Sequence, residues 1–258
     1  MSWLLNALKS SVGKKFVMGG TGLFLCFFLV VHLAGNLLLY IGEAPYNHYA
    51  HALHSNPAFL IFAEVLLYLA FAGHLYIAYA TIRENWAARP IDYGHRRVSK
   101  VPGRIMTPLG LTPDSTMAIT GAIVLLFIIV HVSDFKFEIG WTELENAEPF
   151  AKARDILANP LRKLIYLIGS LILGVHVSHG LASAFHSLGL NHPKYTPILR
   201  KATIAFGLVV AIGFGSFATW GGRTLGLNVT PADEAESNPA AHSHSHSHED
   251  TPPGKPAP

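Results

Sequence analysis

The stretch KFVMGGTGLFLCFFLVVHLAGNLLLYI, residues 15–41, decides the fold class of this chain. After Lys15 it contains no Asp, Glu, Lys or Arg. Its length exceeds the roughly 20 residues that an α-helix needs to cross the hydrocarbon core of a bilayer. Similar apolar stretches occupy residues 57–82, 116–135, 161–188 and 197–220. The sequence therefore predicts an all-α polytopic membrane protein with a bundle of five transmembrane helices.

The overall composition agrees with a membrane protein. Hydrophobic residues make up 50% of the 258 residues and charged residues only 14%, whereas a soluble domain has about 25% charged residues. The single cysteine, Cys26, excludes a disulfide framework, a cysteine-ligated iron–sulfur cluster and a covalent C-x-x-C-H haem. The net charge of +3 comes from Lys and Arg beside the apolar stretches, so we expect no nucleic-acid binding. We expect no cleavable signal peptide, because the first apolar stretch is too long for a signal core.

The distribution of Lys and Arg predicts the orientation of the chain. These residues gather at the N-terminus, in the second connection and in the fourth, whereas the first connection has none and acidic residues dilute the third. Because cytoplasmic loops carry the excess of Lys and Arg, we expect a cytoplasmic N-terminus and an external C-terminus. The long third connection is expected to hold a short amphipathic helix around residues 145–157.

Two regions of different character divide the chain. Residues 1–222 form the predicted membrane domain, and residues 223–258 form a tail rich in His and Pro. Such a composition cannot bury a core, so we expect the tail to be disordered. Its AHSHSHSHED tract could bind transition metals, although variable low-complexity sequence explains the tract more simply.

Four histidines lie deep in four of the predicted helices, one in each. They are His32, His74, His131 and His176. An imidazole is costly in lipid unless it has a partner, so each marks a candidate functional site. At a rise of about 1.5 Å per residue, His32 and His131 fall in the outer half of the bilayer. His74 and His176 fall in the inner half.

This arrangement predicts two pairs of axial ligands for two stacked haems. Bis-histidine ligation fills both axial positions of an iron, which suits electron transfer rather than oxygen chemistry. The simpler explanation, that each histidine only hydrogen-bonds a polar neighbour between helices, accounts less well for four histidines sorted by depth. In the fourth helix His176 and His179 share a face, and depth slightly favours His176.

At these residues the chain resembles the di-haem cytochrome b membrane subunit of succinate dehydrogenase and quinol:fumarate reductase. The resemblance spans roughly residues 10–222 and includes the number of helices. It implies that His74 and His176 hold the haem nearer the cytoplasm and that His32 and His131 hold the distal haem. The matching stretches are TGLFLCFFLVVHLAGN, AFAGHLYIAY, MAITGAIVLLFIIVHVSDF and GVHVSHGLASAFHSLG.

The resemblance further implies that the chain anchors a flavoprotein and an iron–sulfur protein on the cytoplasmic face. Electrons would pass between these subunits, two b-type haems and menaquinone or another quinone. Some menaquinol-oxidising relatives have a glutamate two residues before the fourth-helix ligand, where this chain has Gly174. That difference favours succinate oxidation. The chain contains nothing that resembles a flavin site or a dicarboxylate clamp.

Further candidates surround these histidines. Glu64, His48 and His51 are expected on the outer side, where they could border a quinone site. An ordinary interfacial position explains Glu64 about as well and explains the two histidines better. Arg97 and Arg104, in the inner basic connection, could bind haem propionates, although the positive-inside rule already accounts for such charges.

Two alternative functions fit parts of the sequence. Another di-haem membrane cytochrome, such as a nitrate reductase gamma subunit or a cytochrome b561, would also carry intramembrane histidines. Those families typically place two ligands on one helix or pair different helices, so one ligand on each of the first four helices argues against them. The second alternative is a haem-free histidine-bearing transporter or proton channel.

Overall fold

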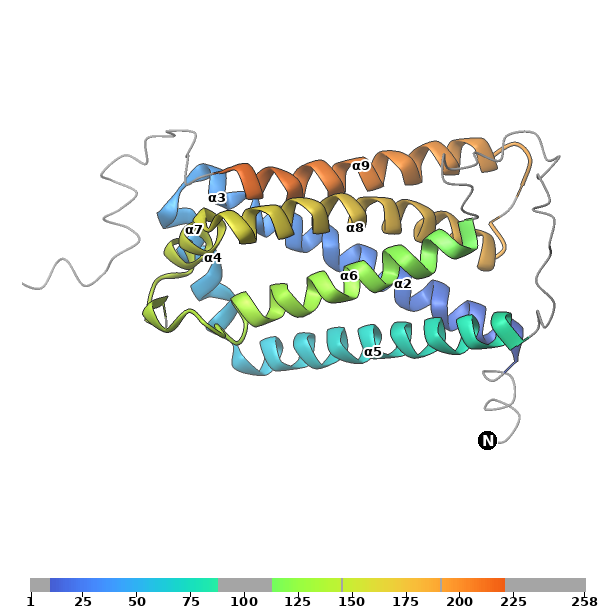
Figure 1. The fold of residues 1–258 in the computed structure, drawn as a ribbon, viewed down its shortest axis with the longest axis horizontal. Helices are drawn as coiled ribbons and strands as arrows, with labels where there is room; N and C mark the ends of the chain where they lie inside the picture. The colour runs from blue at the N-terminus through green and yellow to red at the C-terminus, as the bar shows by residue number, and fades with distance from the viewer. Residues whose placement is uncertain (1–9, 88–112, 145, 191, 221–258) are drawn as a thin grey trace, which may run out of the picture.

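The computed structural model describes residues 10–87, 113–144, 146–190 and 192–220. In this part of the chain every regular element is helical, which agrees with the predicted all-α class (Figure 1). Arg97, Arg104 and the predicted tail lie outside the described residues. The elements are α2 (Ser11–Asn36), α3 (Leu38–Ile41), α4 (Glu43–His54), α5 (Pro57–Ala87), α6 (Pro113–Phe135), the 3-10 turn η1 (Thr142–Leu144), α7 (Pro149–Ala158), α8 (Pro160–Ser187) and α9 (Thr196–Trp220).

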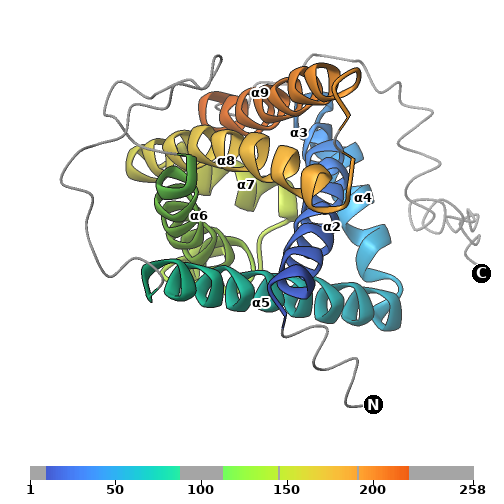
Figure 2. The same ribbon diagram turned by 90° about the vertical axis from the view of Figure 1, so that its right-hand side faces the viewer.

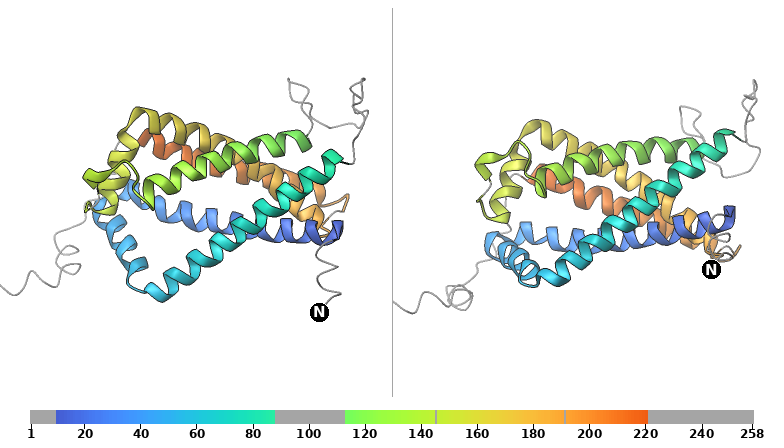
Figure 3. Two further views of the ribbon diagram at one scale, coloured as in Figure 1. Left: turned by 60° about the horizontal axis from the view of Figure 1, so that its bottom comes forward. Right: turned by 90° about the horizontal axis from the view of Figure 1, so that it is seen from below.

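Five of these helical segments are long and apolar enough to cross a membrane, as the sequence predicted. Helix α2 packs against α5 and α8, while α8 also packs against α6 and α9. Seen end-on, α2, α5, α6 and α8 form a ring of four helices, and α9 lies against the outer side of α8 (Figure 2). Helix α5 crosses α2 obliquely (Figure 3). The four helices of the ring are the four that carry the deep histidines.

Prolines stand at the starts of three of the long helices. Pro57 and Pro160 are the first residues of α5 and α8, and Pro197 is the second residue of α9. The first residues of a helix have no intrahelical partner for their N–H, so proline costs nothing there. Asn159 completes the start of α8, because its side-chain oxygen accepts hydrogen bonds from the backbone N–H of Leu161 and Arg162 at 3.0 and 3.1 Å.

The two ends of the bundle differ in character. We call the end where α2 and α9 begin the basic end, because Lys14, Arg83, Arg200 and Lys201 lie in the helix termini there. We call the other end the capped end, because α3, α4, η1 and α7 cover it (Figure 1). The amphipathic helix expected around residues 145–157 is present as α7, and it buries Phe150 and three smaller apolar residues.

Helix α4 lies in the first connection, between the first two apolar stretches, where the sequence predicted no helix. The segment has no continuous apolar stripe and buries no residue completely, so periodicity gave no helical signal. Tyr49 nevertheless packs closely onto α2 at Gly35. A Cβ added to Gly35 would lie 2.6 Å from the Tyr49 hydroxyl oxygen. A tertiary contact therefore accompanies helix formation where local sequence does not predict it.

Small residues bring α8 and α9 into close contact. A Cβ added to Gly174 would lie 2.5 Å from the carbonyl oxygen of Gly207, and one added to Gly207 would lie 2.5 Å from that of Gly174. Ala211 and Ser178 complete the same contact. Close backbone approach through small residues is a principal source of helix association in membranes, where the hydrophobic effect between helices is weak. Gly174 is therefore a packing residue in this fold.

Replacing Gly207 by Val should weaken the fold, because the new side chain would collide with the backbone of α8. We expect a loss of about 1–3 kcal/mol, which is typical of overpacking, seen as earlier thermal unfolding in detergent. Gly20→Val is the matched control, because Gly20 is exposed and a Cβ there would meet no atom within 4 Å. Equal unfolding temperatures for the two variants would contradict the proposed α8–α9 contact.

Candidate functional site

The four deep histidines lie on the four helices of the ring, and each side chain is half-buried. His32 on α2 and His131 on α6 come together towards the capped end. Their ring centroids are 5.8 Å apart, with the ring planes nearly perpendicular. We call this pair the capped-end layer. The structure thus brings together the two histidines that the sequence assigned to one depth.

Aromatic side chains surround the capped-end layer. Phe28 stacks on His32 with centroids 5.2 Å apart, and Phe127 lies 6.1 Å from the ring of His131. Phe28 and Phe127 each precede the histidine by one helical turn. Tyr166 of α8 also contacts His131, at 5.9 Å between centroids. Phe214 of α9 lies 5.6 Å from the ring of His32, so aromatic rings from four helices, α2, α6, α8 and α9, surround the two imidazoles.

His74 and His176 occupy a second level nearer the basic end, which we call the basic-end layer. His74 Nδ1 lies 3.2 Å from the hydroxyl oxygen of Thr21 on α2. His176 Nδ1 lies 3.2 Å from the hydroxyl oxygen of Thr120 on α6. Both threonines precede the capped-end histidine of their own helix by eleven residues. At a rise of 1.5 Å per residue, the two layers are about 16 Å apart.

A glycine lies against each basic-end imidazole, and the approach is tighter at Gly121 than at Gly22. Gly22 follows Thr21, and a Cβ added to it would lie 3.6 Å from Cε1 of His74. Gly121 follows Thr120, and a Cβ added to it would lie 3.3 Å from Cε1 of His176. Each imidazole therefore lies against a helix surface composed of one hydroxyl and one residue without a side chain.

Sequence reasoning missed Thr21 and Thr120, although a signal for them exists in the chain. Residues 18–32 and residues 117–131 share the pattern M-x-x-T-G-x5-F-x3-H. Each copy contains a threonine, a glycine, a phenylalanine and a histidine that face one of the two layers. Comparing the helices with one another, rather than reading each for its own periodicity, would have found both threonines.

The fourth helix offers two histidines, and the structure separates them. His176 contacts Thr120 across the helix interface, whereas the side chain of His179 is exposed.

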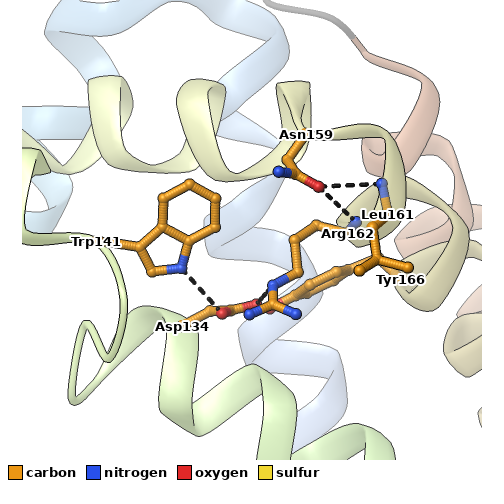
Figure 4. A network of polar contacts seen from close by, with 6 residues as sticks. All are labelled: Asp134, Trp141, Asn159, Leu161, Arg162 and Tyr166. Atoms are coloured by element: carbon orange, nitrogen blue, oxygen red, sulfur yellow. Dashed lines mark hydrogen bonds and ion pairs between the residues drawn. The ribbon is translucent and has the colours of Figure 1, made fainter.

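A buried polar network joins α6 and α8 just beyond the capped-end layer (Figure 4). Asp134 is completely buried. Its Oδ1 accepts a hydrogen bond from Trp141 Nε1 at 3.0 Å, and its Oδ2 accepts one from the Tyr166 hydroxyl at 3.1 Å. Arg162 Nε lies 2.9 Å from Oδ2 and supplies the compensating charge. Since Tyr166 also contacts His131, the network fixes one wall of this layer.

The residues expected near a quinone differ in their contacts: Glu64 and His51 pair with charged side chains, and His48 is exposed. Glu64 forms an ion pair with Lys136 that links α5 to the segment after α6. His51 Nε2 lies 2.9 Å from a carboxylate oxygen of Glu148, and the side chain of His48 is exposed. In the same helix, α4, desolvation raises the pKa of the Tyr46 hydroxyl, so this phenol stays protonated at neutral pH.

The donor set limits which metals these layers could hold. Within the described ranges, no group of three or more His, Cys, Asp or Glu side chains is placed to bind a metal ion. A bare zinc ion needs three or four protein ligands, whereas a haem iron receives most of its ligands from the porphyrin and needs only axial ones. Two histidines in each layer fit the axial ligation of a haem iron.

Comparisons with protein-family models, curated proteins and solved structures found no match to this chain.

Removing the buried carboxylate should destabilise the capped end. We expect Asp134→Asn to cost about 2 kcal/mol, because it leaves Arg162 without its compensating charge at a partly buried position. Thermal unfolding in detergent measures this loss. Asp155→Asn is the matched control, because Asp155 forms only an exposed ion pair with its neighbour Arg154. A variant at Asp134 as stable as this control would contradict the structural role of the network.

Proposed function

We propose that this chain is a membrane cytochrome b with two haems, one in each histidine layer. The observation that carries the proposal is the pairing of four histidines from four helices at two depths. His32 and His131 would hold one haem, and His74 and His176 would hold the other. Bound in this way, bis-histidine haems supply one-electron transfer between the two sides of a membrane.

The chain's own groups suit this task. The porphyrin is flat and apolar, and the rings of Phe28 and Phe127 offer flat apolar contacts beside the capped-end layer. At the basic-end layer, Gly121 lets α6 approach the His176 imidazole closely.

We further propose that the chain is the quinone-reactive anchor of a succinate:quinone oxidoreductase in a bacterial inner membrane. The resemblance of the four histidine-bearing stretches to that family supports this assignment, as does the presence of one ligand on each of four successive membrane helices. The flavoprotein and iron–sulfur subunits would dock at the basic end, on the cytoplasmic side with the N-terminus. The dicarboxylate chemistry would belong to those subunits.

The quinone would react near the capped end. Glu64 precedes His74 by ten residues, so it lies about 15 Å along α5 from the basic-end layer. This is the level of His32 and His131. A carboxylate at this depth can exchange protons with a quinone, and His48 and His51 of α4 are further candidates for the same exchange.

The packing of Gly174 bears on the direction of the reaction. A glutamate at this position serves a proton path in some menaquinol-oxidising relatives. Here the contact with Gly207 leaves no room for any side chain. The chain would therefore lack that path, which favours succinate oxidation as the working direction.

Haem analysis of the full chain, expressed with sufficient haem and purified in detergent, tests the proposed cytochrome. We expect the pyridine haemochrome spectrum to give about two b haems per chain. His32→Ala and His131→Ala should each lose one haem, and His74→Ala and His176→Ala should each lose the other. The double variant His32→Ala/His131→Ala should lose one haem only, whereas His32→Ala/His74→Ala should lose both.

His179→Ala is the matched control, and it should retain both haems. Loss of a haem in this variant, with full retention in His176→Ala, would move the fourth ligand to His179. A wild-type chain without haem would contradict the proposal and favour the haem-free transporter.

A further inference from the structure

The hydroxyl groups of Thr21 and Thr120 have the same three neighbours. Thr21 Oγ1 lies 2.8 Å from the carbonyl oxygen of Val17, 3.2 Å from that of Met18 and 3.2 Å from His74 Nδ1. The corresponding distances for Thr120 are 2.8 Å to Thr116 O, 3.3 Å to Met117 O and 3.2 Å to His176 Nδ1. Two helices about a hundred residues apart in the chain thus build the same contact.

The distances of these contacts favour one position for each imidazole proton. A threonine hydroxyl has one hydrogen, and a backbone carbonyl can only accept. The shortest contact of each hydroxyl, at 2.8 Å, is to a carbonyl oxygen, so the hydroxyl donates there and its oxygen accepts from the imidazole Nδ1–H at 3.2 Å. A neutral imidazole protonated at Nδ1 has a free lone pair on Nε2. Nε2 is then the atom available to a metal.

We propose that Thr21 and Thr120 are positioning residues for the haem of the basic-end layer. Each hydroxyl holds an imidazole from the adjacent helix in one tautomer and one orientation, with Nε2 presented to the iron. The inference rests on the proposed cytochrome function and adds to it two residues that do not touch the haem iron. A partner that accepts the second ring N–H of a metal-bound histidine also raises the basicity of the ligand.

The capped-end layer lacks this arrangement at His32. The Nδ1 of His32 lies 3.4 Å from the amide nitrogen of Asn36, which belongs to the same helix and also donates to the His32 carbonyl oxygen at 2.8 Å. That contact offers a donor, not an acceptor. The two haems should therefore differ, and loss of the threonine hydroxyls should affect only the basic-end haem.

Valine substitutions test the inference, because valine keeps the shape of threonine and removes the hydroxyl. In the full-length haem-loaded chain, we expect Thr21→Val and Thr120→Val each to raise the reduction potential of the basic-end haem. A less basic imidazole stabilises the ferric form less, and each tenfold loss of preference for that form corresponds to 59 mV. The two shifts should add in the double variant, because each hydroxyl acts on a different axial ligand. The capped-end haem, identified as the one that remains in His74→Ala, should keep its potential.

Serine and a distant threonine supply the controls. Thr21→Ser and Thr120→Ser retain a hydroxyl and should restore the wild-type potential and the wild-type electron paramagnetic resonance of the ferric haem. Thr203→Val should change neither, because Thr203 is a buried threonine of α9 whose hydroxyl donates to the carbonyl of Arg200. If the valine variants do not accumulate, alanine variants at the same two positions are compared with the serine variants. This comparison shows whether loss of the hydroxyl changes the potential of the basic-end haem.

The outcomes of these experiments distinguish the proposed cytochrome function from the proposed role of the two threonines. A wild-type chain with two haems, and valine or alanine variants with unchanged potentials and spectra, would overturn the role of the threonines and leave the cytochrome intact. A wild-type chain without haem would overturn both. A selective change in the basic-end haem that serine reverses is the result expected here.

Discussion

The cost of an imidazole inside an apolar helix is the constraint on which this structure depends. Each ring has two nitrogens, and a membrane interior supplies partners for neither. In this fold, each deep histidine contacts a side chain of another helix. Two of the four deep histidines lie against threonine hydroxyls of the neighbouring helix, and the other two lie ring to ring. The threonine contacts join the packed pairs α2–α5 and α6–α8, and the ring-to-ring contact joins α2 to α6 across the bundle.

The cost of burying a polar group without partners also explains the arrangement of side chains at the capped end. Asp134 is a completely buried carboxylate one turn beyond His131, and it is tolerated because an indole, a phenol and a guanidinium surround it. Helix α7 and the turn before it bring Trp141 to this site and cover the end of the bundle. The α8–α9 contact through Gly174 and Gly207 then attaches the fifth helix, which carries no deep histidine. Polar partners thus organise the ring, and small residues attach the helix outside it.

Much of this arrangement could be predicted from the sequence, because the relevant physics is local. Apolar length predicted five helices long enough to cross a membrane, and depth along each helix predicted the two histidine levels. Helix α4 was missed, because its stability comes with the docking of Tyr49 over Gly35 rather than with an apolar stripe. Thr21 and Thr120 were missed because a threonine hydroxyl in an apolar helix can donate to a carbonyl oxygen of its own helix and needs no other partner. An imidazole reaches each hydroxyl only because α5 packs against α2 and α8 packs against α6. The ion pair of Glu64 with Lys136 likewise depends on packing that no local pattern encodes.

Near-infrared magnetic circular dichroism of the oxidised full-length chain would identify the ligands of both proposed haems, because the charge-transfer band of a low-spin ferric haem depends on its axial ligands. We expect a band of bis-histidine type with an intensity that corresponds to two haems per chain. Absence of a haem band, or a band from any other axial pair, would contradict the proposed cytochrome function.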